Sequence, residues 1–283
     1  MSLALKREQL LARLSALPSC AVAFSAGVDS TVVAKAAQLA LGDRAVAVTG
    51  TSPSMAEGEL DEARELAALI GIRHVIVETS EFSQLEYLRN APDRCYHCKT
   101  ELYTQLDQLL PQLGLAYAAN GANADDLADY RPGLRAANEH HVLSPLAECG
   151  LTKAEVRELA REWQLPVWDK PATPCLSSRV AYGEEVTPQR LAMIDQAEQF
   201  LRSRGWRTVR VRYHKGDLAR LEVPVEALSS LIDDSFRREL IARLREIGFK
   251  FVALDLEGFR SGSLNQLVQL EISAVPSAGR SCP

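Results

Sequence analysis

The chain has 283 residues, of which 47% are hydrophobic and 24% charged, so it has a globular composition and enough length for two domains. The formal net charge of -5 argues against a broad basic surface for nucleic acid. Because no apolar run approaches the roughly 18 residues of a membrane helix, the composition also argues against a membrane protein.

The N-terminus and the cysteines bear on location. Residues 1–8 mix charged and apolar side chains and are unlike a secretion signal. Six cysteines in a chain of this length do not form the pattern of a disulfide-rich secreted protein. We therefore expect a cytoplasmic protein.

The first half of the sequence alternates strand and helix patterns. Strands are predicted at residues 20–24, 44–49, 73–79 and 115–120, and helices at 3–17, 30–41, 54–70 and 100–113. This alternation predicts an α/β fold with a doubly wound parallel sheet. Ligands bind at the carboxyl ends of such strands, where the sequence places the loop after residue 24, Thr49, and residues 120–123.

The pattern changes after a helix at residues 152–164, where Thr152 and Glu155 match a capping box. An irregular stretch at 167–183 precedes a small α+β region, with helices at 187–205 and 235–247 and strands at 207–213, 219–223 and 249–254. We expect an N-terminal domain at 1–184, a smaller domain at 185–272 for substrate binding or oligomerisation, and a disordered tail at 273–283.

The first strand runs into the sequence Ser25-Ala26-Gly27-Val28-Asp29-Ser30 and then into a helix. A strand, a turn of small residues and a helix N-terminus form a site for phosphate, although a serine-capped helix is the simpler alternative. The loop resembles the S-G-G-x-D-S loop of the PP-loop ATP pyrophosphatases, with Ala26 in place of a glycine. Alanine is tolerated there at negative φ and strained at positive φ.

Two further stretches carry metal-ligand side chains. Asn123, Asp125, Asp126 and Asp129 follow the fourth strand, and their oxygens suit Mg²⁺, although a solvated acidic turn is the alternative. Cys95 and Cys98 form a C-x-x-C, whose spacing alone leaves zinc, an iron–sulfur cluster, a redox disulfide and no function open.

Cys175 and a set of arginines complete the chemistry-bearing residues. Cys175 lies near Arg179 in a polar loop, which makes it either a candidate reactive thiolate or an ordinary exposed thiol. Arg210 and Arg212 share one strand face and form a paired donor set for phosphate or carboxylate, unless that face is merely solvated.

Five collinear motifs resemble the LarE family of ATP-dependent sulfur transferases, which make the organic part of the nickel-pincer nucleotide of lactate racemase. They are residues 25–30, 123–133, 175–179, 209–212 and 258–262. The resemblance implies that ATP adenylates a carboxylate of pyridinium-3,5-biscarboxylic acid mononucleotide, releasing pyrophosphate, and that a sulfur nucleophile then displaces AMP. Two rounds give the bisthiocarboxylate.

The resemblance also assigns residues to roles. The catalytic residues are expected to be Cys175, Asp29, Arg212 and Glu198. Nucleotide and substrate binding is assigned to Ser25, Ala26, Gly27, Val28, Asp29, Ser30, Thr49, Asn123, Asp125, Arg179, Arg210, Arg212, Glu222 and Arg260. Mg²⁺ is assigned to Asp125 or Asp29, while Glu198 and Glu222 orient substrate or bind a second ion.

Some members of the family surrender the sulfur of one cysteine, whereas others hold a 4Fe–4S cluster on three. This chain has three cysteines in matching places, so we expect a 4Fe–4S cluster on Cys95, Cys98 and Cys175, refilled by a sulfide source. A sacrificial Cys175 is the alternative. The resemblance further implies a small-molecule nucleotide substrate and a homo-oligomer.

Readings from other classes remain open at this point. They are a PP-loop amidotransferase, a PP-loop tRNA thiolase, which the net charge disfavours, and an ATP-binding sensor or iron–sulfur carrier without turnover.

Overall fold

The computed structural model describes residues 1–128 and 132–260, and these fall into two compact units. The first contains residues 1–88 and 93–175, and the second contains 89–92 and the chain from Leu176 onward. The sequence pattern predicts the boundary between the two domains after residue 184. The expected tail at 273–283, the last part of the expected second domain and Asp129 lie outside the described residues. Within the described ranges, no helix is long and apolar enough to cross a membrane.

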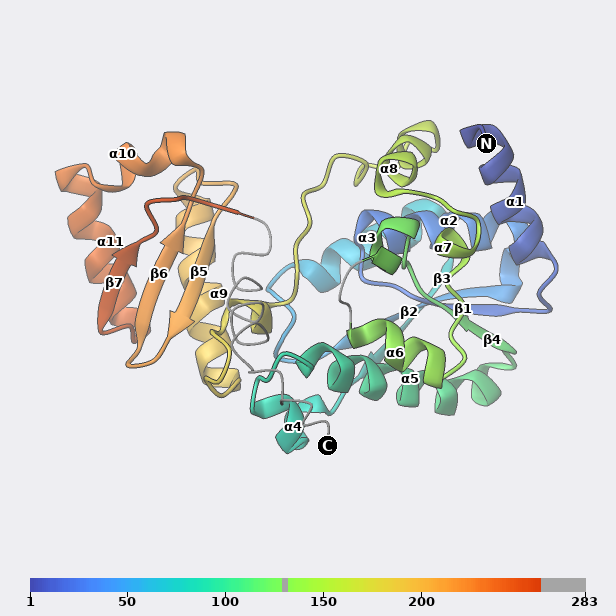
Figure 1. The fold of residues 1–283 in the computed structure, drawn as a ribbon, viewed down its shortest axis with the longest axis horizontal. Coiled ribbons are helices and arrows are strands. Elements are labelled where there is room, and N and C mark those ends of the chain that lie inside the picture. The colour runs from blue at the N-terminus through green and yellow to red at the C-terminus, as the bar shows by residue number, and fades with distance from the viewer. Residues whose placement is uncertain (129–131, 261–283) are drawn as a thin grey trace, which may run out of the picture. The chain divides into compact units, whose positions relative to one another are not determined.

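The first unit is built on a parallel sheet that has four strands in the described residues, in the order β3-β2-β1-β4 (Figure 1). The strands are β1 (Cys20–Ala23), β2 (Ala45–Thr51), β3 (Arg73–Glu78) and β4 (Tyr117–Ala119). The prediction of a doubly wound α/β sheet is confirmed. Because β1 pairs with both β2 and β4, the direction of winding reverses beside β1, and ligands bind at such a switch point.

Side chains that alternate along β1 and β2 build a core on each face of the sheet. Cys20 and Val22 pack on one face with α1 (Leu3–Ser15), α2 (Val28–Leu41), α3 (Glu59–Ile70), α7 (Pro145–Glu148) and α8 (Lys153–Glu162). Ala21 and Val46 pack on the other face with α5 (Arg94–Leu113) and α6 (Pro132–Glu139). The sheet is therefore the middle of three layers, as Figure 1 shows.

Two helix starts differ from the sequence-based expectation. Helix α3 begins at Glu59 rather than residue 54, because the Ser54 hydroxyl contacts Ser52 and Glu81 instead of capping a helix. Helix α5 begins at Arg94 rather than residue 100, so the C-x-x-C occupies its first turns. The polar residues 94–99 carry no apolar periodicity, which is why the pattern did not reveal them as helix. The one-turn helix α4 (Leu85–Leu88) was not expected either.

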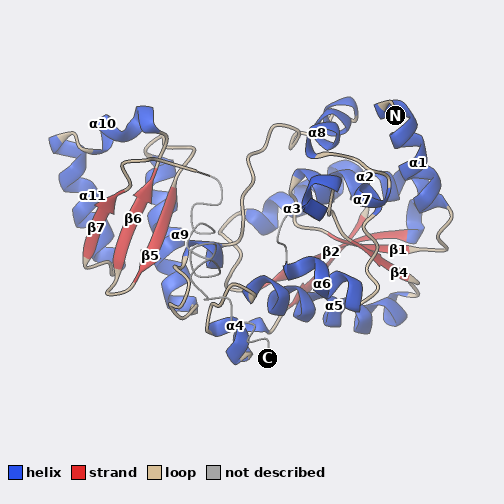
Figure 2. Cartoon of the chain, viewed as in Figure 1, coloured by secondary structure: helices blue, strands red, loops and turns tan. Residues whose placement is uncertain are grey.

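The second unit contains, in its described residues, a three-stranded mixed sheet (Figure 2). Strands β5 (Arg210–His214) and β6 (Leu218–Glu222) are antiparallel, whereas β7 (Phe251–Leu254) runs parallel to β6. Helices α9 (Pro188–Ser203) and α11 (Asp234–Ile247) pack on each other and against β5 and β7 respectively, and α10 (Leu228–Leu231) is one turn. The predicted hairpin at 215–217 is confirmed, with Gly216 and Asp217 at positive φ.

The short segment 89–92 joins the second unit through Asn90. This asparagine is fully buried, and its side-chain amide donates to the carbonyl oxygens of Val180, Ala181 and Glu184 at 3.2, 2.8 and 3.0 Å. Its backbone is left-handed, a conformation that asparagine tolerates better than most residues. The second unit is therefore assembled from two stretches of chain about 80 residues apart.

Candidate active site

The loop after β1 ends in an anion-binding helix terminus. Gly27 is the N-cap of α2, and within the described part of the chain no side chain caps this helix. The Ser30 hydroxyl contacts the Gly27 carbonyl at 3.1 Å and the Ser25 amide at 3.2 Å, which fixes the shape of the loop. The first amides of α2 are thus left to bind an anion, supported by the helix dipole. Thr31, in the first turn of α2, is fully buried.

Ala26 adopts the conformation that disfavours alanine. Its φ is +55°, in the left-handed region, and its side chain is buried in the core of the first unit. A non-glycine residue there costs about 1–2 kcal/mol. The departure from the family's glycine therefore leaves a strained residue in the middle of the loop.

The loop after β4 approaches the same helix terminus. A Cβ on Gly121 would lie 2.7 Å from the Ser30 amide nitrogen, so only glycine allows this approach. Two residues further on, the Asn123 side chain donates to Asp29 Oδ1 at 3.2 Å. The predicted convergence of these two loops at the carboxyl edge of the sheet is present.

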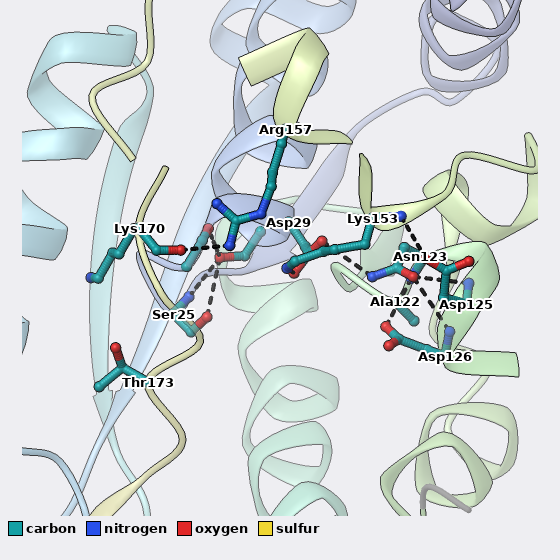
Figure 3. A network of polar contacts seen from close by, with 12 residues as sticks. Ser25, Asp29, Ala122, Asn123, Asp125, Asp126, Lys153, Arg157, Lys170 and Thr173 are labelled. Atoms are coloured by element: carbon teal, nitrogen blue, oxygen red, sulfur yellow. Dashed lines mark hydrogen bonds and ion pairs between the residues drawn. The ribbon is translucent and has the colours of Figure 1, made fainter. Parts of the chain in front are cut away.

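Lys153 joins the two loops, and the sequence analysis did not single it out. Its ammonium forms an ion pair with Asp29 Oδ2, and its backbone amide donates to Asp125 Oδ2 at 2.8 Å (Figure 3). Its place in the sequence carries one signal, since it directly follows the capping residue Thr152 and so begins α8. Asp29, Asn123, Asp125 and Lys153 thus form one polar cluster at the anion site, and carboxylate oxygens such as those of Asp29 and Asp125 are the ligands that Mg²⁺ prefers.

Lys170 is a second cation that the sequence analysis passed over. Its ammonium lies 2.6 Å from Glu62 Oε2 and 3.4 Å from the carbonyl oxygen of Ala26. Arg157 of α8 donates to the carbonyl oxygens of Trp168 and Lys170, both at 2.7 Å. The irregular segment that leads to Cys175 is therefore fastened to the body of the first unit.

Thr49 lies beneath the site rather than on its surface. The hydroxyl is buried, donates to the Phe24 carbonyl at 2.8 Å and lies 2.8 Å from His74 Nε2. Burial, together with the charge of Arg64, lowers the pKa of His74 below its usual 6.5. In this arrangement Thr49 supports the strand end instead of presenting its hydroxyl to a ligand.

The three cysteines of the predicted cluster site all belong to the first unit. The pKa of Cys98 is raised to about 12, mainly by burial; Lys99 opposes this rise, and Cys175, Glu81 and Cys95 add to it. The three thiols therefore lie close enough to influence one another. Among the described residues, no group of three histidine, cysteine, aspartate or glutamate side chains is placed to hold a single metal ion. A 4Fe–4S cluster bound by three thiolates would use a separate iron for each of them.

The second unit buries a network of arginines and glutamates. Arg179 makes two contacts with Glu198 at 3.1 and 3.4 Å, and Arg212 donates to Glu222 at 2.9 Å. The side chains of both glutamates are fully buried, and Arg210 is only 5% exposed. The alternative of a solvated strand face is therefore wrong.

Further arginines contact the carboxylates of this network. Arg202 pairs with Glu198, and Arg220 pairs with Glu222 and Asp255. Burial and the neighbouring arginines 212 and 179 lower the pKa of Arg210 to about 10. Arg210 also lies over the Phe259 ring, and the next residue, Arg260, pairs with Glu257. Guanidinium groups gathered in this way suit an anionic ligand.

The parallel sheet, the β1 loop and its helix terminus define the class of the first unit: it is a PP-loop ATP pyrophosphatase domain. More distant sequence relatives agree with this class. The chain is 31% identical over 207 residues to a tRNA-specific 2-thiouridylase of Thermosynechococcus vestitus, which covers 60% of this chain and 55% of that protein. No protein-family model matches the chain.

Two relatives match nearly the whole chain. An uncharacterized protein of Synechocystis is 46% identical over 263 residues, covering 93% of this chain and 98% of that protein. The pyridinium-3,5-bisthiocarboxylic acid mononucleotide synthase of Lactiplantibacillus plantarum is 38% identical over 266 residues, covering 93% and 95%. The chain therefore belongs to the LarE family, the family of that synthase.

Proposed function

We propose that the protein is an ATP-dependent sulfur transferase that converts carboxylates of pyridinium-3,5-biscarboxylic acid mononucleotide into thiocarboxylates. The observation that carries this proposal is the uncapped N-terminus of α2, with Asp29, Asn123 and Lys153 beside it. It is supported by the relative that is named as the pyridinium-3,5-bisthiocarboxylic acid mononucleotide synthase and that matches nearly the whole chain. The product of this reaction is the organic part of the nickel-pincer nucleotide.

The first step is the adenylation of a substrate carboxylate. A carboxylate oxygen attacks the α-phosphorus of ATP, the bond between the α- and β-phosphates breaks, and pyrophosphate leaves. The amides at the start of α2 stabilise the charge of the leaving pyrophosphate. Lys153 lies next to these amides and adds a positive charge, while Asp29 and Asp125 supply oxygen ligands for Mg²⁺.

The arginine network of the second unit is the proposed binding site for the anionic groups of the mononucleotide. Its arginines support this proposal, because bidentate guanidinium groups suit both phosphate and carboxylate. Glu198 and Glu222 hold Arg179 and Arg212 in place, which makes them positioning residues in this proposal.

The sulfur step displaces AMP from the acyl adenylate and leaves a thiocarboxylate. Cys95, Cys98 and Cys175 would hold a 4Fe–4S cluster, and the chemistry that this cluster would supply is a sulfide nucleophile. The presence of the C-x-x-C beside Cys175 in one unit is what favours this arrangement over a sacrificial Cys175 acting alone. A sulfide source must then refill the site after each transfer.

The decisive experiment combines pyrophosphate release with metal analysis. Protein purified without oxygen should release pyrophosphate from Mg-ATP only when the pyridinium substrate is present, and Asp29→Asn should suppress this release. About four irons per chain, with matching acid-labile sulfide, is the expected content for the cluster. Absence of iron, with loss of the Cys175 sulfur after one turnover, would establish the sacrificial route instead. Nucleotide binding without substrate-dependent pyrophosphate release would exclude the proposed activity.

The remaining expectations are part of the same proposal. We expect a cytoplasmic homo-oligomer that acts on a small molecule and does not bind nucleic acid. Light scattering after size-exclusion chromatography measures the oligomeric state. Retention on tRNA at low salt would support the tRNA-thiolase alternative, which has a relative among the distant matches.

A further inference from the structure

The segment that leads to Cys175 is held by the same lysine that touches the anion-binding loop. Between the end of α8 and Cys175 the backbone forms turns and irregular structure, without a strand or a long helix. Lys170 lies five residues before Cys175, and its ammonium contacts both Glu62 of α3 and the Ala26 carbonyl. Figure 3 shows Lys170 beside the loop that contains Ser25.

The contact to Ala26 involves the peptide group that faces the anion site. The Ala26 carbonyl and the Gly27 amide belong to one planar trans peptide, so they point in opposite directions. An anion bound by the Gly27 amide would polarise this peptide and strengthen the hydrogen bond that its carbonyl accepts from Lys170. The peptide thus lies between the phosphate position and the lysine.

The conformation of Ala26 makes this peptide sensitive to whether an anion occupies the site at the start of α2. Its left-handed φ is unfavourable for alanine, so the loop conformation depends on neighbouring contacts to hold it. Lys170 provides one such contact from outside the loop, at 3.4 Å. An anion on the amide side and Lys170 on the carbonyl side would hold the same peptide together.

From these contacts we infer that Lys170 is a positioning residue that couples occupancy of the anion site to the position of Cys175. This inference rests on the proposed function, because the anion is the pyrophosphate portion of ATP and Cys175 belongs to the sulfur site. When the triphosphate binds, Lys170 holds the Cys175 segment more firmly against the loop. When pyrophosphate leaves, the segment is released.

The test uses protein without bound iron and measures the rate at which iodoacetamide alkylates Cys175. The rate is followed by mass spectrometry of the peptide that contains this cysteine. The probe is the magnesium complex of α,β-methylene-ATP, which cannot be cleaved between the α- and β-phosphates. In the wild type, saturating analogue should slow alkylation of Cys175 by about fivefold, the lower end of typical coupling between sites. Alkylation of Cys149 serves as the internal control, because this cysteine is half-buried and belongs neither to the anion site nor to the set of Cys95, Cys98 and Cys175.

Three variants separate coupling from simple fastening. Lys170→Gln should lose the response of Cys175 and weaken binding of the analogue by about fivefold, because coupling between two sites is reciprocal. Lys170→Arg should restore the response, because a guanidinium can still donate to the Ala26 carbonyl. Glu62→Gln is the matched control: it removes the ion pair but leaves the lysine's contact with the loop, so the response should persist.

Each contrary result has a distinct meaning. An analogue that binds the wild type without altering Cys175 alkylation overturns the inference, as does a normal response in Lys170→Gln. A loss of about tenfold or more in analogue affinity in Lys170→Gln would make Lys170 a phosphate ligand instead of a coupling residue. If the wild type does not bind the analogue at all, the proposed function itself fails, and the inference fails with it.

Discussion

Gly121→Ala tests the close approach of the β4 loop to the anion site. The added Cβ would lie 2.7 Å from the Ser30 amide nitrogen and 3.0 Å from the Asp29 carbonyl carbon. Ordinary van der Waals contact begins at 3.4 Å, so the two backbones must separate by about 0.7 Å. Both atoms belong to the backbone of the first turn of α2, which cannot turn aside as a flexible side chain can.

This displacement acts where the leaving pyrophosphate is expected to bind. A misplacement of about 1 Å can cost 10²-fold in rate, so we expect pyrophosphate release to fall by about 10- to 100-fold. Overpacking should also destabilise the protein by about 1–3 kcal/mol. Activity is measured as substrate-dependent pyrophosphate release, and stability by urea unfolding.

Gly71→Ala is the control for a general loss of stability. Gly71 has φ +77° at the end of α3, and a Cβ there meets open space among the described residues. It should lose about 1 kcal/mol of stability through backbone strain, with pyrophosphate release unchanged. Wild-type activity and stability in Gly121→Ala would refute the close approach and its assigned role.

Three other predictions address separate parts of the structure. Lys153→Met should raise the KM for Mg-ATP at least about tenfold, because Asp29 loses its partner beside the phosphates; an unchanged KM in steady-state assays would argue against that role. Glu222→Gln should cost about 3 kcal/mol or more in urea unfolding, because a fully buried carboxylate that pairs with Arg212 and Arg220 loses its charge. His74 has a lowered pKa in the folded state, so its contribution to stability should be complete above pH 6.5 and be lost as the pH falls below it. The fall in Tm between pH 7.5 and 5.5 should therefore be smaller in His74→Asn, and an equal fall would contradict this assignment.

The fold and the anion site follow largely from local sequence signals. The strand, the small-residue turn and the helix of residues 20–41 lie within one short stretch, so their geometry is readable from residue order. The convergence of the β1 and β4 loops follows from parallel topology alone. The capping box at Thr152 and Glu155 likewise depends on neighbours three residues apart, and it is present.

The cations at the site were harder to predict because their partners are distant in sequence. Lys153 pairs with Asp29 across 124 residues, and Lys170 reaches Ala26 across 144. A lysine at the start of a helix or in a proline-containing loop looks like an ordinary surface residue. The sequence placed Arg210 and Arg212 on one face, but their burial depends on helix α9 and on the pairing of β5 with β6.

The contribution of Asn90 to the second unit limits how that unit could be moved between proteins. A fragment that starts at Leu176 lacks Asn90, and three carbonyl groups lose the donor on which they converge. An unsatisfied buried carbonyl costs about 1–3 kcal/mol, so such a fragment should fold poorly by itself. A single recombination event at residue 176 would therefore transfer an incomplete unit. Inheritance of this unit requires residues 89–92 to travel with it, which ties its evolution to that of the nucleotide-binding half of the chain.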